Sequence, residues 1–288
     1  MGTGLLSFGS WLKGRTAKPS REREILDEFS RELDLVETQV PMLHGYSRID
    51  PYVIDVDQAG VQYQLIIYHT ESKAWFDNDI KDAALVYSQD EALVQPGFTV
   101  FDLGCNSGFL TNWFAKRVGP TGKVLAFDPF PWNTLATLYS AKLNGFTNVH
   151  CHTLGIADTY RKIQIPFCDS KTYENSAVAS DHTFTAKLVP LDEYKSLRPD
   201  FIKVDIEGAE RDLLKGADGI LRQNPKPTWF LEIHNEYIQA AGHDPNQIAV
   251  DYTKAGYDCH IGHPRGPAFD PAQPLPNGCA LFAVPRRN

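Results

Sequence analysis

The chain has 288 residues, and its 42% hydrophobic share is ample for a buried core, so we expect one folded α/β domain with additions. The 28 Lys and Arg residues are dispersed and are outnumbered by 36 Asp and Glu, which argues against a nucleic-acid partner because nucleic acids bind a basic face. Five widely spaced cysteines form no CxxC pair and predict buried thiols in a reducing compartment, so we expect a cytoplasmic protein. The apolar start of the chain is too short to span a membrane.

An N-terminal extension, residues 1–75, is predicted to precede the main domain, residues 76–288. Its first part predicts an amphipathic helix, because apolar side chains recur at three- and four-residue spacing opposite a charged face: Ile25, Leu26, Phe29, Leu33 and Val36. Its second part, residues 52–70, alternates apolar and polar residues on either side of residues 57–60 and predicts a β-hairpin. We expect the helix to dock on another part of the protein and the hairpin to form an antiparallel addition ahead of the main domain.

In the main domain, short apolar strands alternate with helical segments. The predicted strands lie at 99–103, 123–128, 149–154, 201–205 and 228–234, with two closing strands at 256–261 and 278–284. The predicted helices lie at 77–95, 109–118, 134–143, 209–221 and 238–255. A strand pair is predicted at 162–166 and 185–189, inside an irregular stretch, residues 158–199. The alternation predicts a doubly wound parallel sheet with ligands at the carboxyl ends of its strands.

The stretch TVFDLGCNSGFL, residues 99–110, predicts a strand, a tight turn and a helix, which is an arrangement that binds ligands at its unpaired N–H groups. The turn reads G-x-N-x-G, with Gly104, Asn106 and Gly108, and differs from the G-x-G-x-x-G of dinucleotide sites. Asp102 inside the strand disfavours a phosphate ligand. It suits a cationic ligand such as S-adenosylmethionine, which carries an ammonium and a sulfonium.

Two further carboxylates are candidates for the same ligand. Asp128 ends the second strand of the domain, where its two oxygens are placed to accept hydrogen bonds from both ribose hydroxyls. The alternative for Asp128 is a helix or turn cap before Pro129. Asp158 follows the third strand, and it either meets the adenine amino group or is a plain turn residue.

Five stretches together resemble the FkbM-type family of S-adenosylmethionine-dependent O-methyltransferases: VFDLGCNSGFLT, AFDPFPWN, PLDEY, FIKVDIEGAERDLLKGA and LEIH. The resemblance runs from about Tyr63 to Val284, and its most specific part is residues 203–210. It implies the class I methyltransferase fold, which is a doubly wound, seven-stranded, mostly parallel α/β sheet whose last strand is antiparallel. Cys105 and Asp128 stand where the family commonly has Ala and Glu, and neither departure bears on cofactor binding.

The catalytic candidates follow the fourth and fifth strands. Asp205 and Glu207 end one strand, and Glu232 and His234 end the next, so the two acidic strand ends are expected to be neighbours. We expect His234 to be the general base, because an imidazole pKa near 6.5 suits proton uptake at neutrality and a carboxylate can orient it. The alternative is a structural histidine. Asp205 and Glu207 either bind substrate, orient the base or hold a divalent metal ion, and the metal is not the favoured choice.

Together these features predict an S-adenosylmethionine-dependent O-methyltransferase that moves a methyl group to a hydroxyl or carboxyl oxygen of a small molecule, such as a sugar, polyketide or natural-product intermediate. The irregular stretch, including Tyr173, Asn175 and Ser176, is expected to choose the acceptor. One rival is a scaffold that binds the cofactor without methylating, and a less favoured one is an NAD-linked oxidoreductase. The residues leave open the acceptor, the oligomeric state and the role of the extension.

Overall fold

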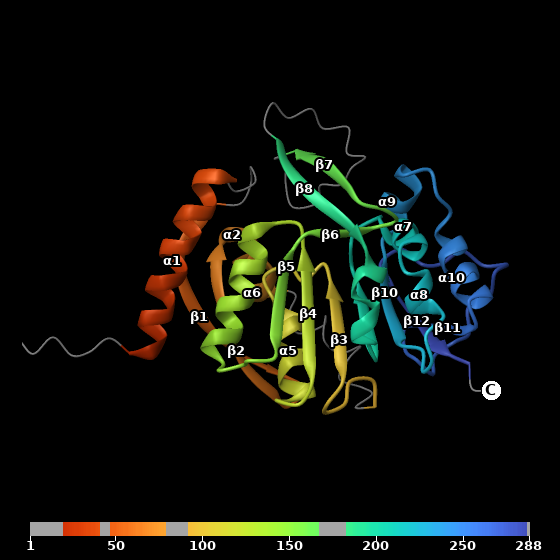
Figure 1. Ribbon diagram of the computed structural model, residues 1–288, viewed down its shortest axis with the longest axis horizontal. Helices are drawn as coiled ribbons and strands as arrows, with labels where there is room; N and C mark the ends of the chain where they lie inside the picture. Colours follow the sequence, from red (N-terminus) through yellow and green to blue (C-terminus); the bar gives the residue numbers. More distant parts are fainter. Residues whose placement is uncertain (1–19, 41–46, 79–91, 167–182, 287–288) are drawn as a thin grey trace, which may run out of the picture.

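The computed structural model describes residues 20–40, 47–78, 92–166 and 183–286. A seven-stranded sheet forms its centre, with the strand order β11-β12-β10-β9-β3-β4-β5 (Figure 1). The strands are β3 (Thr99–Leu103), β4 (Lys123–Asp128), β5 (Val149–Thr153), β9 (Phe201–Val204), β10 (Thr228–Ile233), β11 (Tyr257–Ile261) and β12 (Cys279–Pro285). β12 pairs antiparallel with both of its neighbours, whereas β3, β4, β5, β9 and β10 pair in parallel. The predicted α/β fold class is therefore confirmed, including the antiparallel last strand.

Helices cover both faces of this sheet because its strands are apolar on both sides. The helices after β3 are α5 (Phe109–Val118), α6 (Pro131–Leu143), α7 (Glu210–Lys215), α8 (Asp218–Leu221), α9 (Asn235–Ala240) and α10 (Pro245–Lys254), with a 3₁₀ helix over Leu191–Leu197. Neighbouring residues of β3 point to opposite faces. Val100 packs in a core with α5, and Phe101 packs in another core with α7, α8 and α10.

Two predicted helices are each broken in two. The segment 209–221 forms α7 and α8, which are separated at Gly216, a poor helix former. The segment 238–255 forms α9 and α10. Asp244 caps α10 by accepting a hydrogen bond from Asn246 N, and Pro245 stands at its first turn. The sequence therefore predicted the helical regions correctly and missed the breaks inside them.

The predicted N-terminal helix and hairpin are both present. They are α1 (Arg21–Gln39), which Ser20 caps, and the antiparallel pair β1 (Arg48–Gln58) and β2 (Val61–His69), followed by α2 (Thr70–Asn78). The apolar side of α1 packs against α6 and β2, with Phe29 and Leu33 fully buried beside Tyr68. The extension thus shares its core with the main domain. The predicted helix at 77–95 falls mostly outside the described residues, and residues 92–97 form turns.

A small second sheet stands over the carboxyl ends of β4 and β5 (Figure 1). Its strands are β6 (Gly155–Ala157), β7 (Arg161–Pro166) and β8 (Thr183–Pro190), in the order β6-β8-β7. The β7–β8 pair confirms the predicted strand pair, and Phe184 of β8 packs 5.2 Å from the ring of Phe130 at the start of α6. Tyr173, Asn175 and Ser176 lie outside the described residues.

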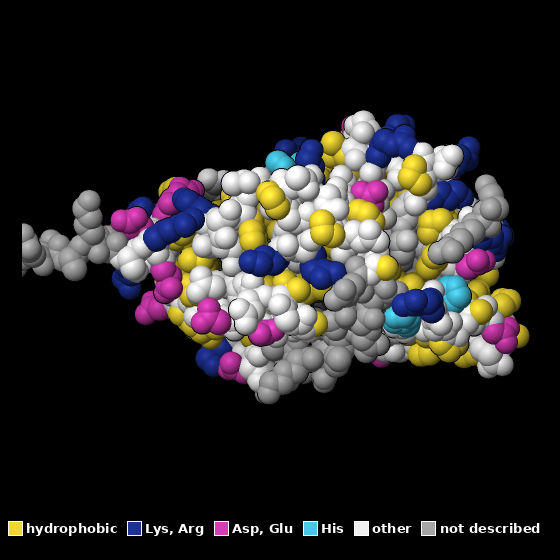
Figure 2. All heavy atoms as spheres, turned by 90° about the horizontal axis from the view of Figure 1, so that it is seen from below, with side chains coloured by type: hydrophobic (Ala, Val, Ile, Leu, Met, Phe, Trp, Pro, Cys, Tyr) yellow, Lys and Arg dark blue, Asp and Glu magenta, His cyan; other side chains and the backbone are white. Residues whose placement is uncertain are grey.

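The surface carries charges of both signs. Figure 2 views the molecule from below, where Lys and Arg side chains are mixed with acidic ones and acidic side chains gather at the end that carries α1. Among the described helices, none is both long and apolar enough to cross a membrane.

Candidate active site

The turn between β3 and α5 is held tightly by the surrounding backbone. The N–H groups of Gly104 and Cys105 both donate to Phe127 O, at 2.8 and 3.0 Å. Gly104 has φ +76, and a Cβ there would lie 1.8 Å from the carbonyl oxygen of Asp205. A Cβ on Gly108, φ +90, would lie 2.8 Å from the Cα of Thr137. The two glycines are thus already required by contacts within the protein, and the Gly104 contact places the turn directly against the β9–α7 loop.

Asp102 lies below this turn and is fully buried. Its Oδ2 accepts a 2.5 Å hydrogen bond from Thr111 Oγ1, and its Oδ1 lies 3.4 Å from Lys203 Nζ. Burial raises the pKa of the Asp102 carboxyl, which the Lys203 ammonium opposes. Asp102 therefore supports the turn from beneath, and its predicted contact with a cofactor stays a prediction.

Asp128 lies at the carboxyl end of β4 and is only 5% exposed. Its Oδ1 accepts hydrogen bonds from Phe130 N and Asn133 Nδ2, at 2.9 and 3.1 Å, and its Oδ2 accepts one from Asn106 N at 3.0 Å. Burial raises its pKa to about 6 despite these three donors. A carboxylate offers about four acceptor sites, so one remains on this residue. Asp128 thus caps the turn, as the alternative expected, and its predicted contact with a ribose stays a prediction. Binding both ribose hydroxyls would require one present donor to move away.

Asp158 follows β6 and forms an ion pair with Arg161, which also reaches Asp212 Oδ2 at 3.5 Å. This arrangement is that of a turn residue with a local partner. Its predicted contact with adenine stays a prediction.

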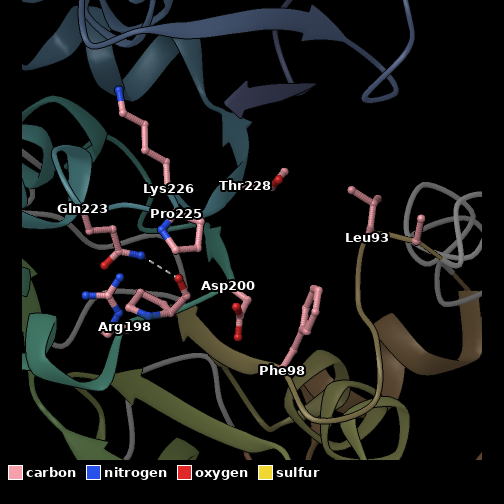
Figure 3. Close-up of a pocket in the computed structure, with 10 residues that line it drawn as sticks. Leu93, Phe98, Arg198, Asp200, Gln223, Pro225, Lys226 and Thr228 are labelled. Carbon is pink, nitrogen blue, oxygen red and sulfur yellow. Dashed lines mark hydrogen bonds between the residues drawn. The ribbon is translucent and has the colours of Figure 1, made fainter. Parts of the chain in front are cut away.

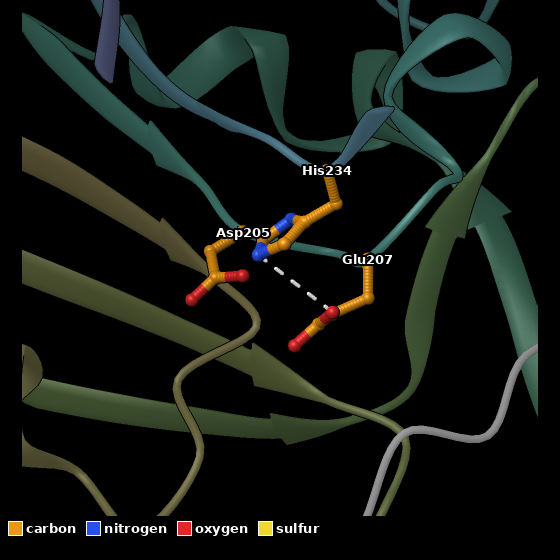
Figure 4. Close-up of side chains that lie close together, drawn as sticks. All are labelled: Asp205, Glu207 and His234. Atoms are coloured by element: carbon orange, nitrogen blue, oxygen red, sulfur yellow. Dashed lines mark ion pairs between the residues drawn. The ribbon is translucent and has the colours of Figure 1, made fainter. Parts of the chain in front are cut away.

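The four catalytic candidates meet at the carboxyl ends of β9 and β10. Figure 4 shows Asp205, Glu207 and His234 pointing toward one another. His234 Nε2 lies 3.7 Å from Glu207 Oε2 and 3.6 Å from Glu232 Oε1. We call Asp205, Glu207, Glu232 and His234 the acid cluster. The prediction that the two acidic strand ends are neighbours is confirmed.

The backbone places these side chains by two local features. Glu207 has φ +55, an uncommon conformation for a residue with a Cβ, and it lies in the turn between β9 and α7. His234 directly follows β10 as the N-cap residue of α9, so its ring sits where the strand ends. The unusual φ of Glu207 directs its carboxylate to the imidazole from the neighbouring strand end.

Carboxylates outnumber the one imidazole in the acid cluster, and this excess of negative charge shifts the pKa values of His234 and Glu207. The adjacent carboxylates of Glu232, Glu207 and Asp205 raise the pKa of His234 to about 9, against the opposing effect of burial. Burial and the nearby Asp205 raise the pKa of Glu207 to about 7. The expectation of an unperturbed imidazole was therefore wrong, because three carboxylates face one ring. At neutral pH His234 is an imidazolium, and Glu207 is the member that titrates near neutrality.

Two more ionisable residues support the cluster. Lys203 Nζ lies 3.3 Å from Asp205 Oδ2 and 3.4 Å from Asp102 Oδ1, so it pairs with both carboxylates. Glu210 was given no role from the sequence, although it is fully buried and both of its carboxylate oxygens accept from Gly208 N. An acidic residue two positions after a glycine, in the first turn of a helix, was the signal that could have identified it.

Three atoms of the cluster are spaced for a metal ion. Asp205, Glu207 and His234 each offer one ligand atom, and these atoms lie within 4.8 Å of one another. Carboxylate oxygens with one imidazole suit a divalent cation such as Mn²⁺. The ion would have to displace the proton of His234 and share Asp205 with the Lys203 ammonium.

A cavity of about 270 Å³ lies at the other ends of the strands, near the amino ends of β3, β9 and β10 (Figure 3). Phe98, Asp200 and Thr228 line it, and Gln223 Nε2 donates to Pro199 O at 2.9 Å beside it. Ligands of parallel sheets bind at the carboxyl ends of the strands. The acid cluster and the β3–α5 turn, which meet at that edge, are therefore the better candidate site.

Comparison with known proteins adds a family match. The Methyltransferase FkbM domain matches residues 102–259, which is just over half of the chain. All ten site residues predicted from the sequence lie inside this range. Among curated proteins, one relative is "Methyltransferase 1" from Beauveria bassiana (strain ARSEF 2860), 27% identical over 146 residues, with 41% of this chain and 58% of the relative covered. The chain thus matches less than two thirds of that relative's length.

Several solved structures are similar at low identity. Methyltransferase FkbM from Methylobacillus flagellatus KT is 21% identical with a TM-score of 0.40, covering 65% of this chain and 44% of that one. Fibrillarin from Aeropyrum pernix, in complex with natively bound S-adenosyl-L-methionine, is 14% identical with a TM-score of 0.40, covering 84% of this chain and 99% of that one. A SAM-dependent O-methyltransferase from Thermotoga maritima is 13% identical with a TM-score of 0.41, covering 82% and 79%.

Proposed function

The chain belongs to the family of FkbM-domain methyltransferases, and on that premise we propose that it transfers a methyl group from S-adenosylmethionine to a hydroxyl oxygen of a small molecule. The observation that carries this proposal is the meeting of the β3–α5 turn with the acid cluster, where Gly104 contacts the backbone of Asp205. A cofactor on the turn would thus lie beside ionisable groups able to accept a proton.

The residues around the turn suit the cofactor. Asp128 keeps about one free acceptor site for a ribose hydroxyl, and the excess of carboxylates nearby favours a ligand that carries a positive charge. When bound, S-adenosylmethionine supplies a methyl group that its sulfonium already activates. The protein then has to align the acceptor, exclude water and receive a proton.

The charge of the acid cluster favours a hydroxyl over a carboxylate as acceptor. Asp205, Glu207 and Glu232 surround His234, so a negatively charged acceptor would be repelled, whereas a neutral hydroxyl would not. A carboxylate that accepts the methyl group has no proton to lose, so it needs no base. The titratable carboxyl of Glu207 would then have no role in methyl transfer.

We assign the proton acceptor to Glu207. Its pKa of about 7 suits proton uptake at neutral pH, and the His234 imidazolium 3.7 Å away orients it. As the O–H bond of the substrate hydroxyl breaks, Glu207 takes the proton. S-adenosylmethionine held by the turn would supply the methyl group to that oxygen and leave as S-adenosylhomocysteine. His234, the general base expected from the sequence, becomes the residue that holds Glu207 in place.

The test is a methyl-transfer assay with purified protein, S-adenosylmethionine and a panel of sugars, hydroxylated polyketides and small hydroxy acids, read by mass spectrometry of S-adenosylhomocysteine and product. We expect S-adenosylhomocysteine to form with at least one alcohol. Cofactor binding by calorimetry with no turnover on any acceptor would favour the scaffold alternative. Tight binding of NAD without binding of S-adenosylmethionine would favour the oxidoreductase.

A further inference from the structure

Lys203 is an ammonium buried between the two halves of the site. It lies in β9 directly opposite Asp102 of β3 in the parallel register, and it is only 3% exposed. A lysine is rarely buried unless anions and hydrogen-bond acceptors surround it. The groups that contact the Lys203 ammonium therefore indicate its role.

The partners of Lys203 come from both halves of the site. On the side of the turn, its Nζ donates to Gly104 O at 2.6 Å and to Leu103 O at 3.4 Å. On the side of the acid cluster, Nζ lies 3.3 Å from Asp205 Oδ2, while Asp102 Oδ1 lies 3.4 Å away beneath the turn. One ammonium thus joins the backbone of the cofactor turn to a carboxylate of the acid cluster.

A second contact links the same two segments. The backbone of Gly104 approaches the Asp205 carbonyl so closely that no side chain fits between them, and Asp205 N donates to Leu103 O at 3.0 Å. The turn and the start of the β9–α7 loop are therefore in direct backbone contact, and the Lys203 ammonium lies between the charged side chains beside that contact. Without that ammonium, Asp102 and Asp205 would be left as neighbouring carboxylates, one of them fully buried, which is strongly unfavourable.

We propose that Lys203 is a positioning residue that holds the cofactor turn and the acid cluster in register, so that cofactor affinity and methyl transfer depend on it together. The part of this inference that concerns catalysis rests on the proposed function. Lysine suits the place because a compact ammonium with three donors can serve Gly104 O and two carboxylates at once, whereas the planar fork of arginine cannot.

The experiment compares Lys203→Met with Lys203→Arg and with a matched control, Lys123→Met, which changes an exposed lysine of β4 in the same sheet. Three quantities are measured: the Kd for S-adenosylhomocysteine by calorimetry, kcat at saturating cofactor, and hydrogen exchange of peptides covering residues 103–108 and 204–210. We expect Lys203→Met to weaken binding and to lower kcat by at least about tenfold each, and to speed exchange in both peptides. Lys203→Arg should recover part of each loss, and Lys123→Met should match the wild type.

The hydrogen-exchange comparison decides the inference even if the wild type shows no methyl transfer, so the two failures are distinguishable. A Lys203→Met protein that exchanges faster in neither peptide, or in one alone, would contradict the coupling. Loss of binding without loss of kcat, or the reverse, would contradict it equally. If Lys203→Met does not fold, the double variant Lys203→Met with Asp102→Asn takes its place, because it removes both buried charges. The same measurements are made on it, and the same outcomes support or contradict the inference.

Discussion

The β3–α5 turn and the acid cluster lie at the same edge of the sheet, but they differ in how their polar groups are paired. In the turn, Asp128 has three hydrogen-bond donors, and the N–H groups of Gly104 and Cys105 share one carbonyl. In the acid cluster, His234 faces carboxylates at 3.6 and 3.7 Å, which is beyond hydrogen-bond distance. The turn is a nearly completed hydrogen-bond network, and the cluster is a set of charges held close without full pairing.

This difference suits the turn to binding the cofactor and the acid cluster to the chemical step. A preorganised network binds a ligand with little rearrangement, since most of its groups are already fixed. Closely held, unbalanced charges raise the pKa of His234 to about 9 and that of Glu207 to about 7. A group that titrates near neutrality, as Glu207 does, exchanges protons readily at neutral pH. We therefore expect changes in the turn to alter affinity and changes in the cluster to alter turnover, and variants can test this division.

The largest expected effect is on turnover. Glu207→Gln keeps the size of the side chain and removes the proton acceptor, so kcat should fall by about 10²- to 10⁴-fold while the Kd for S-adenosylmethionine changes less than about threefold. His234→Ala should also lower kcat strongly with nearly intact affinity, because it removes the group that orients Glu207. Steady-state kinetics and calorimetry measure the two quantities.

The control for this pair is Glu236→Gln, the same chemical change at an exposed residue of α9, which should leave both quantities near the wild-type values. Equal loss of cofactor binding in Glu207→Gln and His234→Ala would show that the cluster, too, binds the cofactor, and the division between the two regions would then fail.

The second expected effect is on affinity. Asp128→Ala removes the carboxylate that holds Asn106 and would accept a ribose hydroxyl, so cofactor Kd should rise by about 10- to 100-fold, as expected for losing hydrogen bonds to a charged group. At saturating cofactor, kcat should stay within about threefold. Calorimetry with S-adenosylhomocysteine gives the Kd, and Asp218→Asn, at an exposed ion pair on α8, is the control. A larger drop in kcat than in affinity would place Asp128 with the chemistry instead.

The same contrast explains how far the sequence could predict this structure. Local sequence patterns encode the glycine turn, the strand ends and the apolar side of α1. Periodicity and turn chemistry therefore predicted the positions of these features close to those observed. The pKa values were not predictable, because they depend on which charges β9 and β10 bring together. From the sequence LEIH, His234 was expected to have an ordinary imidazole pKa, yet it faces Glu207 of the loop that follows β9. Glu210 was missed for the same reason, since its burial depends on tertiary packing.

A smaller effect concerns stability and comes from Glu210. Burial raises its pKa from 4.5 to about 7 in the folded state, so the protonated form is favoured on folding. Its contribution to stability is fully present below about pH 4.5 and is lost as the pH rises through 7, by at most about 3 kcal/mol at 1.36 kcal/mol per pKa unit. Glu210→Gln keeps an oxygen that can accept from Gly208 N and cannot ionise. Relative to the wild type, its free energy of unfolding should therefore rise between pH 5 and pH 8.

Denaturant unfolding of both proteins at several pH values measures this difference, and only the part that depends on pH is diagnostic. Gln can differ from Glu in packing, but such a difference would be constant with pH. A wild-type minus variant difference that stays flat from pH 5 to pH 8 would mean that Glu210 titrates with an ordinary pKa. It would also weaken the view that burial sets the charges around the acid cluster.

The smallest expected effect is that of metal removal. Asp205 already pairs with the Lys203 ammonium at 3.3 Å, and the imidazolium of His234 provides a second positive charge among the carboxylates. A divalent ion would have to replace that proton, so we expect dialysis against a chelator to change kcat/KM by less than about twofold. Loss of activity that Mg²⁺ or Mn²⁺ restores would reverse this assignment. It would make Asp205, Glu207 and His234 ligands, and the metal ion would then take over from Glu207 the task of making the acceptor hydroxyl acidic.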